Sequence, residues 1–188
     1  MGRWILFALL GGSALFADLL SKSLAFSSLG MPGRSPPVTV VPGMLWIETS
    51  LNEGAVFGIG QGFGVLFAII SVIAAGFIVI MVARPSTRGD LRLLVALGLI
   101  LGGILGNLYD RLGLPALRWH APPHRVGQPV LAVRDWIHFR LEGVIDWPIF
   151  NLADSWLVIG AFLIVLVSFR PPIGDEPEAA QDSLHASG

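Results

Sequence analysis

Residues 57–83 read FGIGQGFGVLFAIISVIAAGFIVIMVA, an apolar stretch that contains no charged side chain. A membrane-spanning helix needs about 20 mostly apolar residues, so this stretch is long enough to be one. The whole chain of 188 residues has a similar character, because 54% of its residues are hydrophobic, 13% are charged, and its mean hydropathy is +0.74. A soluble domain has about 25% charged residues. The composition therefore predicts a protein that crosses a membrane several times.

Three further stretches are also long and apolar enough to cross a membrane. The chain is therefore predicted to be an all-α membrane protein with four transmembrane helices, at residues 4–26, 57–83, 93–109 and 147–169. We expect residues 1–170 to form one membrane domain. The remaining residues, 171–188, contain acidic residues and prolines with little apolar mass, which predicts a disordered cytoplasmic tail.

Arginines in short connections predict how these helices are oriented. The connection between the second and third spans is short and contains three of them. Lys and Arg in short loops favour the cytoplasmic side, so both termini are predicted to be cytoplasmic. After Arg111, the longer connection 111–146 contains four more arginines, but the rule weakens as loops lengthen. A cleaved signal peptide is the alternative for the N-terminus, although the apolar run resumes after Asp18 and continues to Phe26.

Two segments between the spans are then external. The first, 27–53, contains two β-rich runs, 38–41 and 45–49, around a Pro-Gly turn, which predicts a small β-sheet at the membrane surface. The second, 111–146, has a proline-rich centre that cannot form a regular helix, so we expect a second external loop at the membrane surface.

Polar residues are concentrated at the external end of all four predicted spans. Ionisable groups inside a span are costly and indicate function by default. Asp154 has no cation beside it in the sequence, which favours a functional role, whereas Asp18 and Lys22 have the i, i+4 spacing of a structural ion pair. Interhelical hydrogen bonding is an alternative role for the asparagines. The residues of this layer are Asp18, Lys22, Asn52, Asn107, Asp110, Arg111, Asn151 and Asp154.

Several kinds of chemistry are excluded by what the sequence lacks. It contains no cysteine, which removes disulfides, thiolate metal sites and a cysteine nucleophile. It contains no H-E-x-x-H, no G-x-S-x-G and no phosphate-binding loop. We expect no metal and no cofactor. The net charge of −1 gives no electrostatic reason to expect nucleic acid as a partner.

Four short motifs occur in order at the ends of the predicted spans. The first has the form D-x-x-x-K at residues 18–22, and the second has the form N-x-G-x-x-F-G at residues 52–58. The third is G-G-x-x-G-N-x-x-D-R at residues 102–111, and the fourth is F-N-x-A-D-S at residues 150–155. Together they resemble the motifs of the lipoprotein signal peptidase family, also called signal peptidase II or prolipoprotein signal peptidase.

The resemblance implies a membrane aspartyl endopeptidase of the bacterial cytoplasmic (inner) membrane, with its active site on the periplasmic or external side. Such an enzyme removes the signal peptide from prolipoproteins and cleaves before a cysteine that carries diacylglycerol. The implied partners are these diacylglyceryl-cysteine substrates and membrane lipids, and a monomer is the expected state.

The two catalytic aspartates of the family are implied to be Asp135 and Asp154. Asp154 lies in the F-N-x-A-D-S motif, and Asp135 lies in Val-Arg-Asp-Trp, 19 residues upstream, as the family's spacing requires. Asp146 fits the same short pattern and remains the alternative, although it is only eight residues from Asp154. The long gap between Asp110 and Asp135 indicates an insertion around residues 115–131.

Two neighbouring carboxylates suit peptide hydrolysis by water, because like charges in a poorly solvated site hold one proton between them. The ionised aspartate takes a proton from water while the protonated one polarises the peptide carbonyl. The resemblance also implies residues that hold the substrate or support the pair, namely Asn52, Gly54, Asn107, Asp110, Arg111, Asn151, Asp18 and Lys22.

A small proton- or ion-coupled membrane transporter is the alternative function, with Asp18 and Asp154 as the carriers. Transporters place such groups near the middle of the membrane, whereas the polar residues of this chain are predicted to gather on one side. A non-enzymatic assembly protein is a third possibility, and it would need no paired carboxylates.

Overall fold

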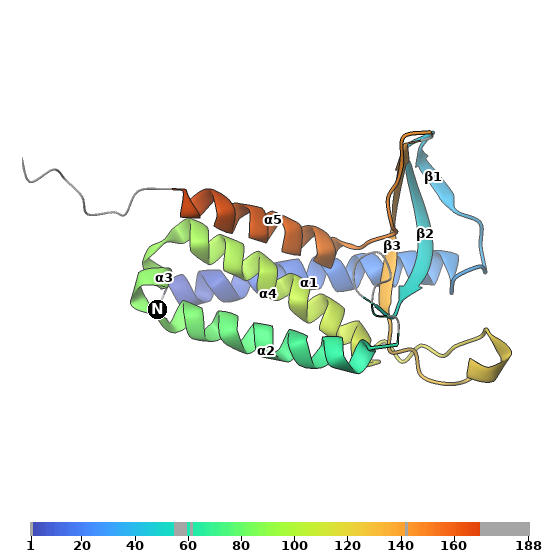
Figure 1. The fold of residues 1–188 in the computed structure, drawn as a ribbon, viewed down its shortest axis with the longest axis horizontal. Coiled ribbons are helices and arrows are strands. Elements are labelled where there is room, and N and C mark those ends of the chain that lie inside the picture. The colour runs from blue at the N-terminus through green and yellow to red at the C-terminus, as the bar shows by residue number, and fades with distance from the viewer. Residues whose placement is uncertain (1, 55–59, 61, 142, 170–188) are drawn as a thin grey trace, which may run out of the picture.

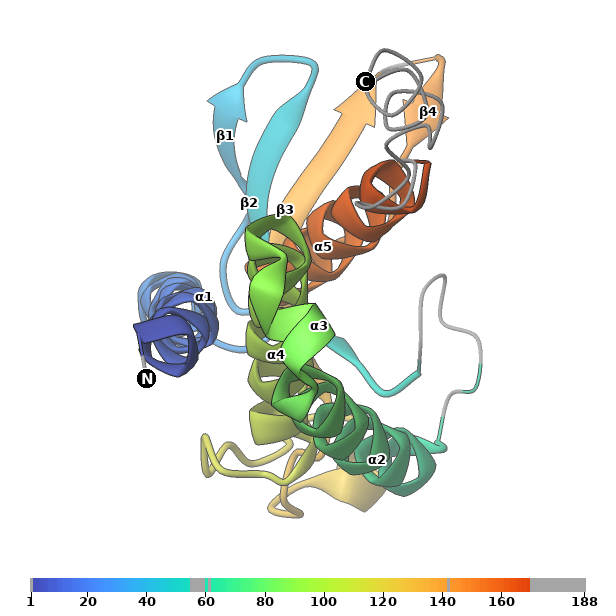
Figure 2. The same ribbon diagram turned by 90° about the vertical axis from the view of Figure 1, so that its left-hand side faces the viewer.

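The computed structural model describes residues 2–54, 60, 62–141 and 143–169, which form a bundle of long helices with a small sheet across one end (Figure 1). The long helices are α1 (Gly2–Leu29), α2 (Gly64–Ala83), α4 (Leu91–Arg111) and α5 (Leu152–Ser168). The short helix α3 (Pro85–Gly89) joins α2 to α4 at the end of the bundle away from the sheet (Figures 1 and 2).

Helices α1, α2 and α4 are each long and apolar enough to cross a membrane, and α5 is a shorter apolar helix. The prediction of a mostly helical membrane protein is therefore confirmed. The predicted spans 4–26 and 93–109 lie within α1 and α4. Helix α2 begins at Gly64, later than predicted. Residues 57–59 and 61 of that prediction lie outside the described residues, as does the predicted tail at 171–188.

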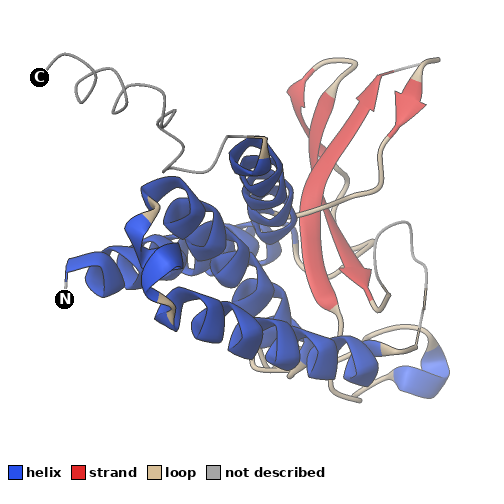
Figure 3. Cartoon of the chain, turned by 60° about the vertical axis from the view of Figure 1, so that its left-hand side comes forward, coloured by secondary structure: helices blue, strands red, loops and turns tan. Residues whose placement is uncertain are grey.

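The sheet is antiparallel, with its strands in the order β1-β2-β3-β4 (Figure 3). As predicted, the first external segment forms a hairpin, of β1 (Val38–Val41) and β2 (Leu45–Asn52). The second external segment was predicted to be a loop, and this is wrong in part because it supplies β3 (Val133–Leu141) and β4 (Ile145–Asp146). Apolar and polar residues alternate along the second half of β3, and this period of two is the signal for a strand.

The fourth helix begins at Leu152 rather than at residue 147. Pro148 has no backbone N–H to donate, and its neighbours extend along β3 instead. The N–H groups of Trp147 and Phe150 donate to carbonyl oxygens of β3, at 2.9 and 3.0 Å. Extended backbone therefore continues until Asn151, which caps α5.

Helix α4 packs closely between α1 and α5 because glycines face both neighbours. A Cβ atom at Gly102 would lie 2.6 Å from the Cβ atom of Ala14 on α1, and one at Gly103 would lie 2.6 Å from the carbonyl oxygen of Ala153 on α5. Small residues allow membrane helices this close approach. The end of the bundle away from the sheet is filled by a core of Phe7, Ile78, Val82, Leu94 and Leu97.

Candidate active site

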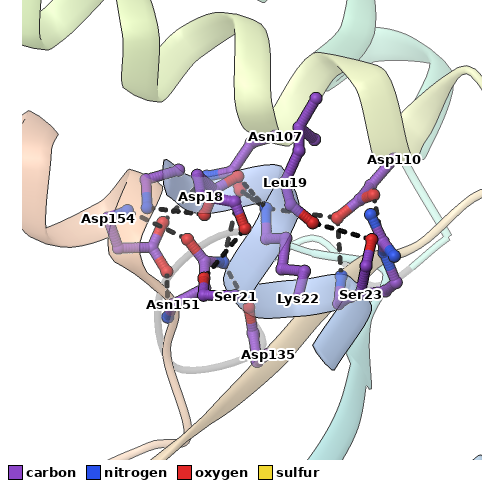
Figure 4. Close-up of polar contacts among 12 residues, drawn as sticks. Asp18, Leu19, Ser21, Lys22, Ser23, Asn107, Asp110, Asp135, Asn151 and Asp154 are labelled. Carbon is purple, nitrogen blue, oxygen red and sulfur yellow. Dashed lines mark hydrogen bonds and ion pairs between the residues drawn. The ribbon is translucent and has the colours of Figure 1, made fainter. Parts of the chain in front are cut away.

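Most of the polar residues predicted to form one layer lie together with Asp135 where the sheet crosses the bundle (Figure 4). They come from five elements, α1, α4, α5, β2 and β3. Buried ionisable groups are stable only when they are paired or hydrogen-bonded, so their partners define the site. The members whose exposed fraction is 2% or less are Asp18, Lys22, Asp110, Asp135 and Asn151.

Asn151 connects the two aspartates predicted to be catalytic. Its side-chain oxygen accepts a hydrogen bond from the backbone N–H of Asp154 at 3.1 Å, and its backbone N–H donates to the Asp154 carboxylate at 3.3 Å. These two bonds form a capping box at the start of α5. Because the amide oxygen is used in this cap, the amide nitrogen faces the other way and donates to Asp135 Oδ1 at 2.5 Å. One residue therefore holds both carboxylates.

Asn107 holds Asp154 from the side of α4. Its amide nitrogen donates to Asp154 Oδ1 at 2.8 Å, and its amide oxygen accepts from Lys22 Nζ at 2.9 Å. The amide oxygen also accepts from the Asn151 amide at 3.2 Å. Since an ammonium group can only donate, Lys22 determines which end of the Asn107 amide points toward Asp154.

Lys22 and Asp110 are the centre of a buried ionic network behind this pair. Lys22 Nζ lies 2.7 Å from Asp18 Oδ2 and 3.2 Å from Asp110 Oδ2. Asp18 also accepts from the backbone N–H of Ala153, at 2.9 Å. Asp110 accepts from the backbone N–H and the Nε of Arg134, at 3.0 and 2.9 Å. The network ties α1, α4, α5 and β3 together around the site.

The electrostatic environment of Asp135 favours its protonated form. Burial, followed by the nearby charge of Asp154, raises the pKa of Asp135 to about 7. Hydrogen bonds from Asn151 and Asn52 oppose this shift. The side chain is 2% exposed, so Asp135 stays partly protonated at neutral pH while it lies beside a second carboxylate.

A cavity of about 530 Å³ opens beside Asp154. Its polar lining is formed by Asn52, Gly54, Asn107, Arg111 and Asp154. The rest is mainly apolar, with side chains from the 147–150 segment and from the first turns of α5. A mostly apolar cavity with a few polar groups at one end suits an extended peptide or an acyl chain.

Comparison with known proteins identifies the family. Residues 10–170 match the profile of the family described as signal peptidase (SPase) II. The chain belongs to the signal peptidase II family. This confirms the resemblance read from the four motifs, and it makes the protein an aspartic-type peptidase.

Individual relatives of this signal peptidase II extend over most of the chain. The lipoprotein signal peptidase of Rhodopirellula baltica is 42% identical over 93% of this chain and 75% of its own length. That of Streptomyces griseus is 39% identical over 84% of this chain and 69% of its own length. A solved bacterial membrane enzyme structure, obtained by the in meso method at 2.3 Å resolution, is 27% identical, with a TM-score of 0.73 and 92% of each chain covered.

The geometry of this signal peptidase II distinguishes between the two candidate partners of Asp154. Asp135 shares Asn151 with Asp154, as described above. Asp146 lies on β4 with its side chain 64% exposed, and it hydrogen-bonds to His138 Nε2 at 2.8 Å. Of the two candidates, only Asp135 shares a hydrogen-bonding partner with Asp154 among the contacts of the described residues.

Two arginines of this signal peptidase II differ from what their sequence positions indicate. Arg134 was not among the predicted site residues, although it pairs with Asp110, and its position beside Asp135 is the one signal that points to it. Arg111 follows Asp110 directly, but it reaches the segment after β2, where it donates to the carbonyl oxygen of Gly54 at 3.1 Å. Gly54 in turn donates its N–H to the Asn52 side chain at 3.0 Å.

Proposed function

We propose that this signal peptidase II uses Asp135 and Asp154 to hydrolyse the peptide bond that precedes the diacylglyceryl-cysteine of a prolipoprotein. Removal of a lipoprotein signal peptide is the activity of the family. The observation that supports the assignment of these two residues is their common partner, Asn151, which donates hydrogen bonds to both carboxylates.

The pair performs acid and base catalysis in turn. The ionised aspartate removes a proton from water as the oxygen attacks the peptide carbonyl, and the protonated aspartate donates to the carbonyl oxygen. When the C–N bond breaks, the aspartate that took the water proton gives it to the leaving nitrogen, and the other aspartate recovers its proton from a hydroxyl group of the tetrahedral intermediate. The products are the carboxylate of the signal peptide and the free amine of the lipidated cysteine. The shared proton belongs to the pair rather than to one residue.

The neighbouring residues position the pair and the substrate. Asn107 and Asn151 donate N–H groups to the Asp154 carboxylate, which fixes its orientation. Arg111, Asn52 and Gly54 form the polar edge of the cavity, where they are placed to contact the substrate backbone. The apolar wall is then available to the apolar part of the signal peptide.

We also propose that both termini are cytoplasmic and that the sheet and the site lie on the external side. This orientation places the site where a lipid-anchored cysteine is held, since acyl chains contribute about 0.8 kcal/mol per buried CH₂. By the charge rule, the arginines of segment 111–146 would favour the cytoplasmic side. Two of them carry less weight in this argument because each is paired with an acidic residue. Arg134 pairs with Asp110, and Arg125 pairs with Glu53.

The direct test is cleavage of a synthetic diacylated lipobox peptide by the purified enzyme in lipid micelles. Asp154→Asn and Asp135→Asn are each expected to lower kcat by at least about a thousandfold, because each removes one of the two proton carriers. Retention of full activity by either variant, with normal folding, would refute the assignment.

The pH dependence of the wild-type enzyme provides a second test. As the pH rises above the pKa of Asp135, near 7, the pair loses the proton that must reach the carbonyl oxygen. We therefore expect kcat to fall about tenfold per pH unit at alkaline pH. A flat profile from pH 6 to pH 9 would contradict the shared-proton mechanism.

A further inference from the structure

The connection from α4 to β3, residues 113–131, includes the predicted insertion and folds into a small hairpin at the sheet end of the molecule (Figures 1 and 3). The N–H of Trp119 donates to the carbonyl of Gln128 at 3.0 Å, and the N–H of Gly127 donates to the carbonyl of Trp119 at 2.8 Å. The helical turn η2 (Pro123–Arg125) lies between these two strands of chain. We call this segment the insertion hairpin. Its own backbone hydrogen bonds make it an ordered platform.

The insertion hairpin holds one side chain against the segment that follows β2. The guanidinium carbon of Arg125 lies 4.0 Å from the centre of the Trp119 ring. Its two terminal nitrogens donate to the two carboxylate oxygens of Glu53, one of them at 3.0 Å. The Arg125 and Glu53 side chains are 27% and 24% exposed. The guanidinium group forms two hydrogen bonds to one carboxylate and is stacked on an aromatic ring. Together these contacts fix both the orientation of the carboxylate and its distance from the arginine.

Glu53 is the central residue of a three-residue segment that contacts the active site on both sides. Asn52 precedes it and hydrogen-bonds to Asp135. Gly54 follows it and accepts from Arg111. Asn52, Gly54 and Arg111 all line the cavity. Glu53 is therefore joined through the backbone to two residues that contact the catalytic pair or line the cavity.

We propose that Arg125 is a positioning residue, which acts through Glu53 to hold Asn52 and Gly54 in place for catalysis. The insertion hairpin is then part of the catalytic apparatus of this enzyme rather than a surface decoration. This inference rests on the proposed function, because it assigns a role within that same site.

The position of the bond predicts two separate kinetic effects. Without the Arg125 contact, Glu53 is less restrained and Asn52 donates to Asp135 for less of the time. That hydrogen bond lowers the pKa of Asp135, so its loss raises the pKa and moves the alkaline limb of the pH profile to higher pH. Displacement of Gly54 also disturbs the polar edge of the cavity, which raises KM.

The test compares Arg125→Met with Arg118→Met in the full-length enzyme. Both variants remove one positive charge from the insertion hairpin, but Arg118 bonds only to the carbonyl of Gly127, at 3.2 Å, among the contacts of the described residues. With the diacylated lipobox peptide, Arg125→Met is expected to lower kcat/KM about fivefold and to shift the alkaline limb upward. Arg118→Met should remain within about twofold of wild type.

A charge exchange tests whether the effect passes through Glu53. The double variant Glu53→Arg, Arg125→Glu should recover most of the activity that Arg125→Met loses, because it restores the pair in reverse. Arg125→Met with the activity and pH profile of Arg118→Met would overturn the proposal. Arg125 would have only a structural role if three results occurred together. The loss of activity would be proportional to the fall in thermal midpoint, the alkaline limb of the pH profile would not move, and the charge exchange would recover no activity. Activity in Asp154→Asn would instead refute the proposed function itself.

Discussion

Asp135→Asn is expected to stabilise the protein at alkaline pH although it destroys activity. The pKa of Asp135 in the folded protein is about 7, against an ordinary value of 3.8. A raised pKa means that the unfolded chain releases this proton at a lower pH than the folded protein does. The folded state is therefore progressively disfavoured as the pH rises from about 4 to about 7, and the cost is constant above that range.

The size of the effect follows from the shift. About three pKa units correspond to roughly 4 kcal/mol of stability lost at pH 9 relative to pH 4. Asparagine has no proton to lose and is free of this cost. It can still accept from Asn151, but its NH₂ group faces the amide of Asn52, which costs roughly 1–2 kcal/mol at every pH. The variant should then be less stable than wild type at pH 4 and more stable by about 2 kcal/mol at pH 9.

Thermal unfolding in detergent micelles, followed by tryptophan fluorescence, measures this difference. For a chain of this size 1 kcal/mol corresponds to roughly 2–4 °C, so the difference between the two thermal midpoints should change by about 10 °C between pH 4 and pH 9. The comparison at each pH cancels the titration of groups that do not interact with Asp135. A difference that stays constant across this range would show that Asp135 is not buried as an acid with a raised pKa, and the reasoning would fail.

Three further predictions concern other parts of the molecule. Asp146→Asn should keep kcat for the lipobox peptide within about twofold of wild type, because its exposed carboxylate bonds to the sheet rather than to the pair. Gly102→Ala should lower the free energy of unfolding by about 1–3 kcal/mol and the thermal midpoint with it, because its Cβ would meet Ala14 and the backbone of α1. Gly76→Ala is the control and should not destabilise the protein, because a Cβ at Gly76 meets nothing within 4 Å. Lys22→Met should lower kcat, because Lys22 orients the Asn107 amide that donates to Asp154. The double variant Lys22→Met, Asn107→Leu should have a kcat only slightly below that of Asn107→Leu alone.

The polar layer could be predicted from the sequence because it depends only on spacing and direction. Asp18 and Asn107 lie toward the C-terminal ends of α1 and α4, and Asp154 lies at the N-terminal end of α5. Because successive spans alternate in direction, these ends lie on one side of the bundle. The motif spacing favoured Asp135 over Asp146, and Asp135 is the one that shares Asn151 with Asp154 in the structure. These inferences require no knowledge of side-chain contacts between distant segments.

Contacts between distant segments could not be predicted in the same way. Nothing in the sequence pairs Arg134 with Asp110, or Arg125 with Glu53, because 24 and 72 residues separate the partners and many acidic residues compete. The strand β3 has a clear alternation, but the prolines at the centre of the same segment dominate its composition. The late start of α5 depends on the pairing of residues 147–150 with β3, which is itself a tertiary contact.

The double use of Asn151 limits how this enzyme could escape an inhibitor. A compound that inserts a hydroxyl or an amine between the two aspartates would bind next to the Asn151 side chain. A substitution of Asn151 that weakened the binding of the compound would also remove the cap of α5. Resistance is therefore expected to arise on the apolar wall of the cavity. Val158 and Ile159, which are 69% and 42% exposed, are positions where a change of shape leaves the helix start intact. Drug design against this site should accordingly draw its affinity from the polar end.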